Sequence, residues 1–87
     1  MRLNKDETAY RRVGDEFFVL TTRDSILHNV RGAGVRVMEL LEEGKGRDEI
    51  VAALLAEFEV DEATLTADVD AFLAALVAKG VLLDDGV

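Results

Sequence analysis

Residues 14–44 read GDEFFVLTTRDSILHNVRGAGVRVMELLEEG, and within them the spacing of apolar residues changes from that of strands to that of a helix. Gly14-Asp15 has glycine first, the pattern of a two-residue type II′ hairpin turn between strands 9–13 and 16–21. Segment 16–21 is apolar at four consecutive positions, which predicts a central strand covered on both faces. Segment 25–30 predicts a third strand, and its polar residues place it at an edge of the sheet.

From Gly32 onward the pattern predicts three helices. The first ends near Gly44, the second covers 47–58, and the third runs from an N-cap at Asp61 to Lys79. Their apolar stripes are Val35, Val37, Met38, Leu40 and Leu41, then Ile50, Val51, Leu54, Leu55 and Phe58, then Leu65, Val69, Phe72, Leu73, Leu76 and Val77.

Three strands followed by three helices predict a small α+β domain of the winged-helix kind, because a three-stranded sheet needs helices on its apolar face. Residues 1–87 are expected to form one domain, with 1–8 as a flexible tail. The apolar segment 81–83 is expected to fold back on the core.

The composition argues against an enzyme. The 87 residues include no cysteine, so a thiolate metal site and a cysteine nucleophile are excluded. The only serine, Ser25, and the only histidine, His28, lie three apart, which points them to opposite faces of a strand. The carboxylates Asp61, Glu62, Asp68 and Asp70 lack the spacing of a calcium loop. We expect no catalytic residue, no metal and no cofactor.

The net charge of -8 is unevenly distributed. Residues 1–47 carry nine Lys/Arg against eight Asp/Glu, whereas residues 48–87 carry one against ten. Phosphate binding depends on Lys and Arg, so nucleic acid is a poor ligand. The longest apolar run, residues 71–78, has eight residues, far below the ~20 that span a bilayer, so no membrane association is expected and the cytoplasm is the default location.

If 25–30 is an open edge, its unpaired backbone groups can accept an added strand. The alternative is an edge that the charges of Asp24 and Arg31 blunt, and these residues alone favour that alternative.

The whole pattern resembles the PqqD family of pyrroloquinoline quinone biosynthesis and, more broadly, the recognition elements of ribosomally made, modified peptides. The resemblance covers roughly residues 10–83. It rests on the spacing of many positions, each of which is only weakly characteristic by itself. These are the hairpin, Ile26 to Asn29, Gly34 to Gly44, Asp48-Glu49-Ile50, Leu54, Phe58, Asp68-Val69, Phe72-Leu73, Leu76 and Gly80-Val81-Leu82. Two departures stand out. The family usually has an asparagine about three residues before the glycine that opens the first helix, whereas Asn29 lies five residues before Gly34 and three before Gly32, so either the turn is two residues longer or the helix begins earlier. Met38 occupies a position that is often tryptophan in the family.

The resemblance implies a protein without enzymatic activity that binds the leader of a precursor peptide and presents it to a modifying enzyme, frequently a radical-SAM enzyme. The leader would pair with the third strand and lie between that strand and the third helix. The implied peptide-binding residues are Ser25, Ile26, Leu27, His28 and Asn29 on the strand and Leu65, Asp68, Val69, Phe72 and Leu76 on the helix.

Two other functions stay open at this stage. One is a DNA-binding winged helix, for which the second and third helices offer only Arg47 and Lys79. The other is a homodimer in which the edge strand pairs with itself.

Overall fold

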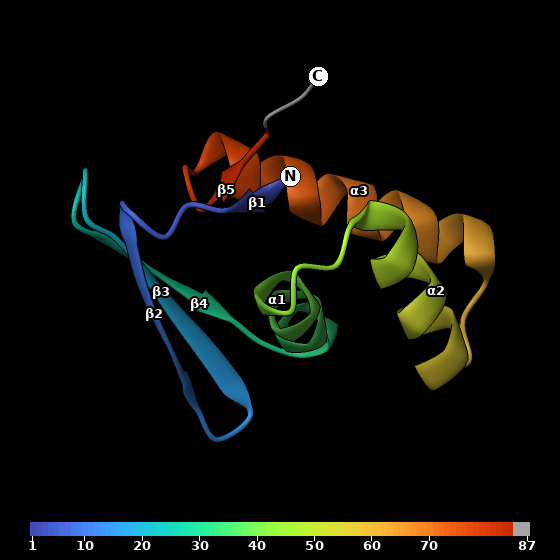
Figure 1. Cartoon of the computed structure of the whole chain (residues 1–87). Helices are drawn as coiled ribbons and strands as arrows, with labels where there is room; N and C mark the ends of the chain where they lie inside the picture. Colours follow the sequence, from blue (N-terminus) through green and yellow to red (C-terminus); the bar gives the residue numbers. More distant parts are fainter. Residues whose placement is uncertain (85–87) are drawn as a thin grey trace.

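The structure of the chain, a computed structural model, describes residues 1–84 (Figure 1). Its first four elements are strands, the next three are helices, and a short strand follows. They are β1 (Arg2–Leu3), β2 (Thr8–Val13), β3 (Glu16–Thr21), β4 (Ile26–Val30), α1 (Ala33–Glu42), α2 (Arg47–Glu57), α3 (Glu62–Ala78) and β5 (Leu82–Leu83). The predicted α+β order of a three-stranded antiparallel sheet followed by three helices is confirmed.

The three-stranded sheet has the order β2-β3-β4, so β4 is an edge strand, as predicted. Val13 pairs with Glu16 across the hairpin, and Gly14 adopts a φ of 61°, which glycine tolerates without strain. The second turn is longer than expected. Ser25, predicted as the first residue of the third strand, instead belongs to this turn with a φ of 57°, a left-handed conformation that cannot continue a strand.

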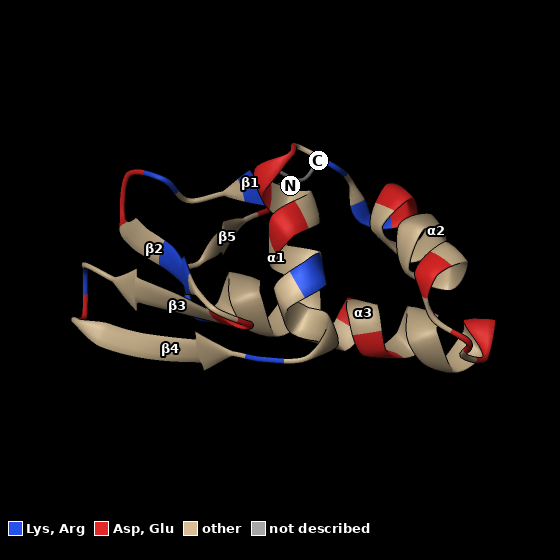
Figure 2. Ribbon diagram, turned by 90° about the horizontal axis from the view of Figure 1, so that it is seen from below, with Lys and Arg blue, Asp and Glu red and all other residues tan. Residues whose placement is uncertain are grey.

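The inner face of this sheet carries Phe17 and Val19 into the core, where α1 packs on β3 and supplies the fully buried Met38. Tyr10 stacks on Phe17 with 5.8 Å between the ring centroids. The expected cover on both faces of β3 is wrong. Leu20 and, across from it, Leu27 lie on the outer face and are 36% and 62% exposed, because all three helices pack elsewhere (Figure 2).

Gly32 decides where the first helix begins. It is the N-cap of α1 with φ 62° and ψ -140°, a conformation close to glycine-only, so the helix starts before Gly34. Asn29 therefore lies three residues before the glycine that opens the helix, the spacing that the resembled family has.

The three helices end and begin as their sequences predict. Gly44 follows α1 with a φ of 84°, and Lys45 N–H donates to the Leu40 carbonyl at 3.0 Å, which closes a Schellman motif. Gly80 closes α3 in the same way. Asp61 caps α3, since its carboxylate accepts from Thr64 N–H at 3.0 Å.

The N-terminal residues are part of the fold and do not form the expected tail. β1 pairs with β5 in an antiparallel two-stranded sheet, with Leu3 opposite Leu82, and both side chains are buried. Asn4 is also buried, and its amide nitrogen donates to the Gly80 carbonyl at 3.1 Å. The predicted return of 81–83 to the core is thus achieved through pairing with residues 2–3.

Two bidentate ion pairs connect the helices. Arg47 at the start of α2 donates to both oxygens of Asp70 on α3 at 2.8 and 2.9 Å, and Arg36 on α1 holds Glu57 at the end of α2. The guanidinium groups lower the pKa of both carboxyls below their ordinary values. None of the helices within residues 1–84 has the length and apolar character needed to cross a bilayer.

Candidate functional site

The candidate site begins at the free edge of β4. Within the described residues β4 pairs with β3 alone, so its other edge has no neighbouring strand. The turn that precedes it is held by Asp24, whose carboxylate accepts from the Thr21 hydroxyl and from Ile26 N–H. The bond from Thr21 is the main reason that the pKa of Asp24 lies below its ordinary value.

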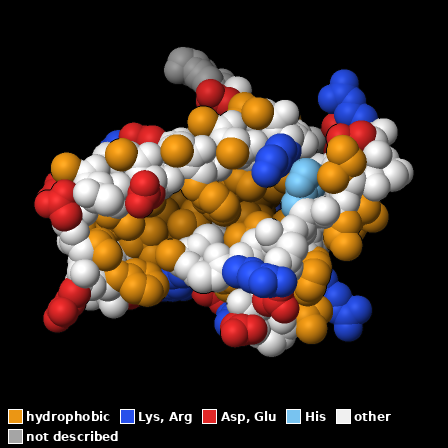
Figure 3. All heavy atoms as spheres, turned by 180° about the vertical axis from the view of Figure 1, so that it is seen from behind, with side chains coloured by type: hydrophobic (Ala, Val, Ile, Leu, Met, Phe, Trp, Pro, Cys, Tyr) orange, Lys and Arg blue, Asp and Glu red, His pale blue; other side chains and the backbone are white. Residues whose placement is uncertain are grey.

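A groove lies between β4 and α3, and we call it the β4–α3 groove. Its strand wall consists of residues 28–31, and its helix wall consists of Phe72, Ala75, Leu76 and Lys79, around a cavity of about 190 Å³. His28 faces this groove from the inner side of the sheet, where its partner across the strands is Val19. Figure 3 shows the hollow on this face, with hydrophobic side chains on its floor and the histidine at one end.

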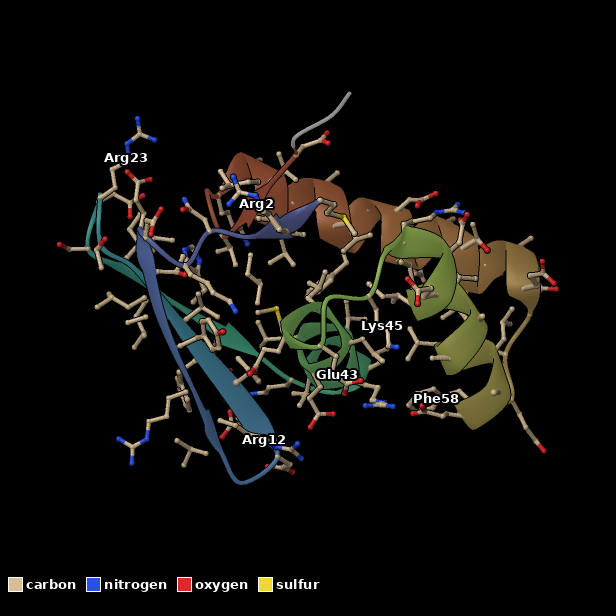
Figure 4. The ribbon with its side chains drawn as sticks, viewed as in Figure 1. Arg2, Arg12, Arg23, Glu43, Lys45 and Phe58 are labelled. Atoms are coloured by element: carbon tan, nitrogen blue, oxygen red, sulfur yellow. The ribbon has the colours of Figure 1, made fainter. Side chains whose placement is uncertain are left out.

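The groove opens at one end into an apolar cavity of about 310 Å³. Phe72 is shared with the groove, and Leu65, Asp68 and Val69 from α3 line the same cavity. Its opposite side is Gly34, Val37 and Leu54. Phe58, which ends α2 in an extended conformation and is 42% exposed, completes the rim together with Val60 (Figure 4). Asp68 is the single charged group of this lining.

The other end of the groove is polar. A cavity of about 410 Å³ lies there between the β3–β4 turn and the end of α3, with Lys79 shared with the groove. Glu7 and Asp24 line it, and both carboxylates already accept hydrogen bonds, Glu7 from Asn4 at 3.2 Å. Arg23 stands at the rim, with a side chain that extends from the turn (Figure 4).

Of the ten predicted site residues, four line the groove and three more line the apolar cavity: His28, Asn29, Phe72 and Leu76, then Leu65, Asp68 and Val69. Ile26 and His28 share the inner face of β4, and Leu65, Asp68, Phe72 and Leu76 follow one face of α3 along the two cavities. Two predicted residues lie elsewhere, Ser25 in the turn and Leu27 on the outer face of the sheet. Val69 lines the apolar cavity but is almost completely buried, so it is also a core residue.

Asn29 also points to the outer face, opposite Phe18. Its side chain donates to Glu16 at 3.2 Å and accepts from Arg31 at 2.7 Å, so it fixes the end of β4. Asn29 is nevertheless among the residues that line the groove.

Sequence reasoning missed Arg31, Ala75 and Lys79 on the groove, and Gly34 and Val60 on the apolar cavity. Lys79 and Ala75 had a usable signal, since they follow Asp68 and Phe72 at helical spacing. Val60 had none, because it lies in a connection without a regular period.

Residues 1–84 contain no group of three or more His, Asp or Glu side chains placed to hold a metal ion. Ser25 lies in the turn and His28 on the inner face of β4, and no hydrogen bond joins the two side chains. Thr21 is the side-chain neighbour of the imidazole, with its hydroxyl oxygen 3.5 Å from Nε2.

This chain is similar to a known protein family and to solved structures. The family model "Coenzyme PQQ synthesis protein D (PqqD)" matches residues 16–82. A search of curated proteins finds no match. The solved structure "TbiB1 in Complex with the TbiA(beta) Leader Peptide" is similar with 33% identity and a TM-score of 0.93, over 100% of both chains. "Lasso peptide synthetase B1 complexed with the leader peptide" is similar with 20% identity and a TM-score of 0.84, over 94% of this chain and 95% of that one.

Proposed function

This chain belongs to the PqqD family, and on that premise we propose that it binds the leader segment of a ribosomally made precursor peptide and presents it to a modifying enzyme. The observation that carries the proposal is the free edge of β4 beside an apolar groove. The relative with 33% identity is named for its complex with a leader peptide, which supports the same ligand class here.

The proposed binding mode is strand addition to β4. The backbone groups of Ile26 to Asn29 would provide main-chain hydrogen bonds, and the groove would accept alternate side chains of the leader. We propose an antiparallel orientation, because every strand pair of this sheet is antiparallel and such pairs are slightly more stable. The leader would then enter at the apolar cavity and leave at the polar one.

The apolar cavity is the proposed anchor for specificity. Its lining is mostly hydrophobic, and its volume of about 310 Å³ suits large apolar side chains that precede the paired segment of the leader. Phe72 would contribute to both parts of the site, since it separates the cavity from the groove.

The function proposed here needs no reactive side chain, so we propose that the chain has no enzymatic activity and that chemistry occurs on a partner. A radical-SAM enzyme is the partner that the family resemblance implies, and the product would be pyrroloquinoline quinone or another modified peptide. A similar chain is named a lasso peptide synthetase component, which supports other peptide-modifying enzymes as the alternative. Purified candidates of both classes can be tested for activity that depends on this chain.

The test is a titration of the ¹⁵N-labelled chain with the TbiA(beta) leader peptide and with the leader of a precursor encoded beside the chain. We expect 1:1 binding with the largest amide shifts at Ile26 to Asn29 and along the groove side of α3. A leader that is N-methylated at alternate residues of its paired segment should lose affinity, while methylation of the intervening residues should not.

Two results would overturn the proposal. One is that neither leader shifts any amide of β4 or α3. The other is a stable homodimer, seen by light scattering, that pairs through β4 and takes no peptide.

A further inference from the structure

The helix wall of the β4–α3 groove has opposite charges at its two ends. Asp68, Phe72, Ala75 and Lys79 follow one another at spacings of four, three and four residues, so they share one face of α3. Asp68 lines the apolar cavity, Phe72 and Ala75 line the groove, and Lys79 lines the groove and the polar cavity. The wall is therefore acidic, then apolar, then basic.

Both end charges are available to a ligand. Within residues 1–84, neither Asp68 nor Lys79 has a hydrogen-bond or ion-pair partner among side chains. Asp70, two residues further along α3, is by contrast fully engaged with Arg47. The other carboxylates beside Lys79 are Glu7 and Asp24, which hold the neighbouring turns together by hydrogen bonds.

The backbone at the basic end does not cancel the charge of Lys79. The last carbonyls of α3 accept hydrogen bonds within the C-terminal turn, from Gly80 N–H to Val77 at 3.1 Å and from Val81 N–H to Leu76 at 2.9 Å. Arg23 adds a second cation at the rim of the same cavity.

We propose that this wall reads a charge pattern in the leader: a basic residue followed about five residues later by an acidic one. The inference deepens the proposed function and depends on it. Eleven residues separate Asp68 from Lys79, about 16 Å along a helix. An extended peptide covers that distance in about five residues at ~3.3 Å each. The antiparallel orientation brings the N-terminal part of the leader to Asp68, so the basic residue comes first.

The charge pattern also fixes the direction of the peptide. In the reversed orientation a leader of this kind would set its cation against Lys79 and its carboxylate against Asp68, and like charges repel. The outcome is surprising for a chain with a net charge of -8, because the basic end of the groove prefers an acidic side chain.

The test is a charge scan of the TbiA(beta) leader peptide, in which each residue of the paired segment is replaced in turn by Lys or Glu and binding is measured by fluorescence anisotropy. We expect one position where Glu binds about 2- to 5-fold more tightly than Lys, the range of exposed ion pairs. The preference should invert in Lys79→Glu. A position about five residues earlier should prefer Lys, and this should invert in Asp68→Lys.

Matched controls separate a local contact from net charge. Lys5→Glu changes the charge as Lys79→Glu does, and Asp15→Lys matches Asp68→Lys, but both lie outside the lining of the groove and its two end cavities. These control variants should leave both charge preferences unchanged. Salt at 0.5 M should weaken both preferences. Equal binding of all charge variants overturns the inference and leaves the proposed function standing. No binding of any leader overturns both.

Discussion

Gly34 shows how one absent side chain shapes the site. A Cβ built at this residue would lie 2.8 Å from Cγ1 of Val30 and 3.3 Å from Cζ of Phe72. Val30 is buried at the end of β4, and Phe72 is the residue shared by the groove and the apolar cavity. The close contact of α1, β4 and α3 therefore depends on glycine at this helical position, although alanine is the better helix former.

We predict that Gly34→Ala lowers the free energy of unfolding by about 1–3 kcal/mol, the usual result of overpacking, and weakens leader binding by displacing Phe72. Urea denaturation and the peptide titration measure the two effects. The matched control is Gly46→Ala. Its φ is -89° and the nearest atom to an added Cβ would be Glu49 Oε1 at 3.8 Å, so no neighbour has to move. The loss should be limited to the preference for glycine over alanine at the N-cap of α2. A stabilised Gly34→Ala protein would contradict the packing argument.

At the scale of the element, the two faces of β3 lie in different environments. Val19 has no exposed surface and faces α1 across the core, whereas its neighbour Leu20 is 36% exposed on the outer face. The solvated face of an antiparallel sheet usually carries polar residues. The outer face of this sheet instead carries Phe18, Leu20 and Leu27.

We predict that Val19→Thr lowers the free energy of unfolding by about 1–3 kcal/mol, because it buries a hydroxyl without a partner. Leu20→Thr should change it by less than about 0.5 kcal/mol, since threonine suits a strand and the site is solvated. Chemical denaturation of both variants decides the matter. Equal destabilisation would mean that the outer face is covered in solution.

The same strand shows what a sequence can and cannot predict. The run of four apolar residues predicted burial of Phe17 and Val19, and both are buried. The apolar character of Phe18 and Leu20 also predicted cover on the outer face, which is wrong. Hydropathy records a preference for burial, but whether a helix lies there depends on the path of the rest of the chain.

Similar reasons explain the other differences. Arg2–Leu3 is too short to show a period, and its partner β5 lies at the far end of the sequence. Nothing in serine predicts the left-handed φ of Ser25. The edge strand and the apolar stripe of α3 are local patterns that the sequence shows, but a groove between them was implied only by the family resemblance. The charged residues at its ends depend on the phase of α3 relative to β4, which no local pattern contains.

For the whole molecule, acid should weaken the fold through three carboxyls whose ionised form accepts stabilising hydrogen bonds. The pKa values of Asp24, Glu57 and Asp70 lie below their ordinary values, chiefly because of hydrogen bonds from Thr21, Arg36 and Arg47. The unfolded chain therefore binds more protons than the folded one in this range. Their stabilisation is present above the ordinary values of 3.8 for Asp and 4.5 for Glu, and is lost as the pH falls below them.

We predict that the free energy of unfolding is constant between pH 7 and about pH 5 and then decreases toward pH 3. Urea denaturation across this range measures it. Asp70→Asn removes one of the three carboxyls, so its curve should fall less steeply, whereas Asp15→Asn should follow the unchanged chain. A free energy of unfolding that rises on acidification would contradict the lowered pKa values of these carboxyls.

The pairing of β1 with β5 has a consequence for the order in which the molecule assembles. Leu3 leaves the ribosome about eighty residues before Leu82, its partner across the two strands. Contacts with such a long separation along the chain form late, because the intervening loop must close first. The hairpin and the helices can assemble during synthesis, while the first residues wait beside them. Completion of this small sheet thus reports that residues 2–83 have folded, and removal of residues 1–4 would leave Val81 and Leu82 without their cover.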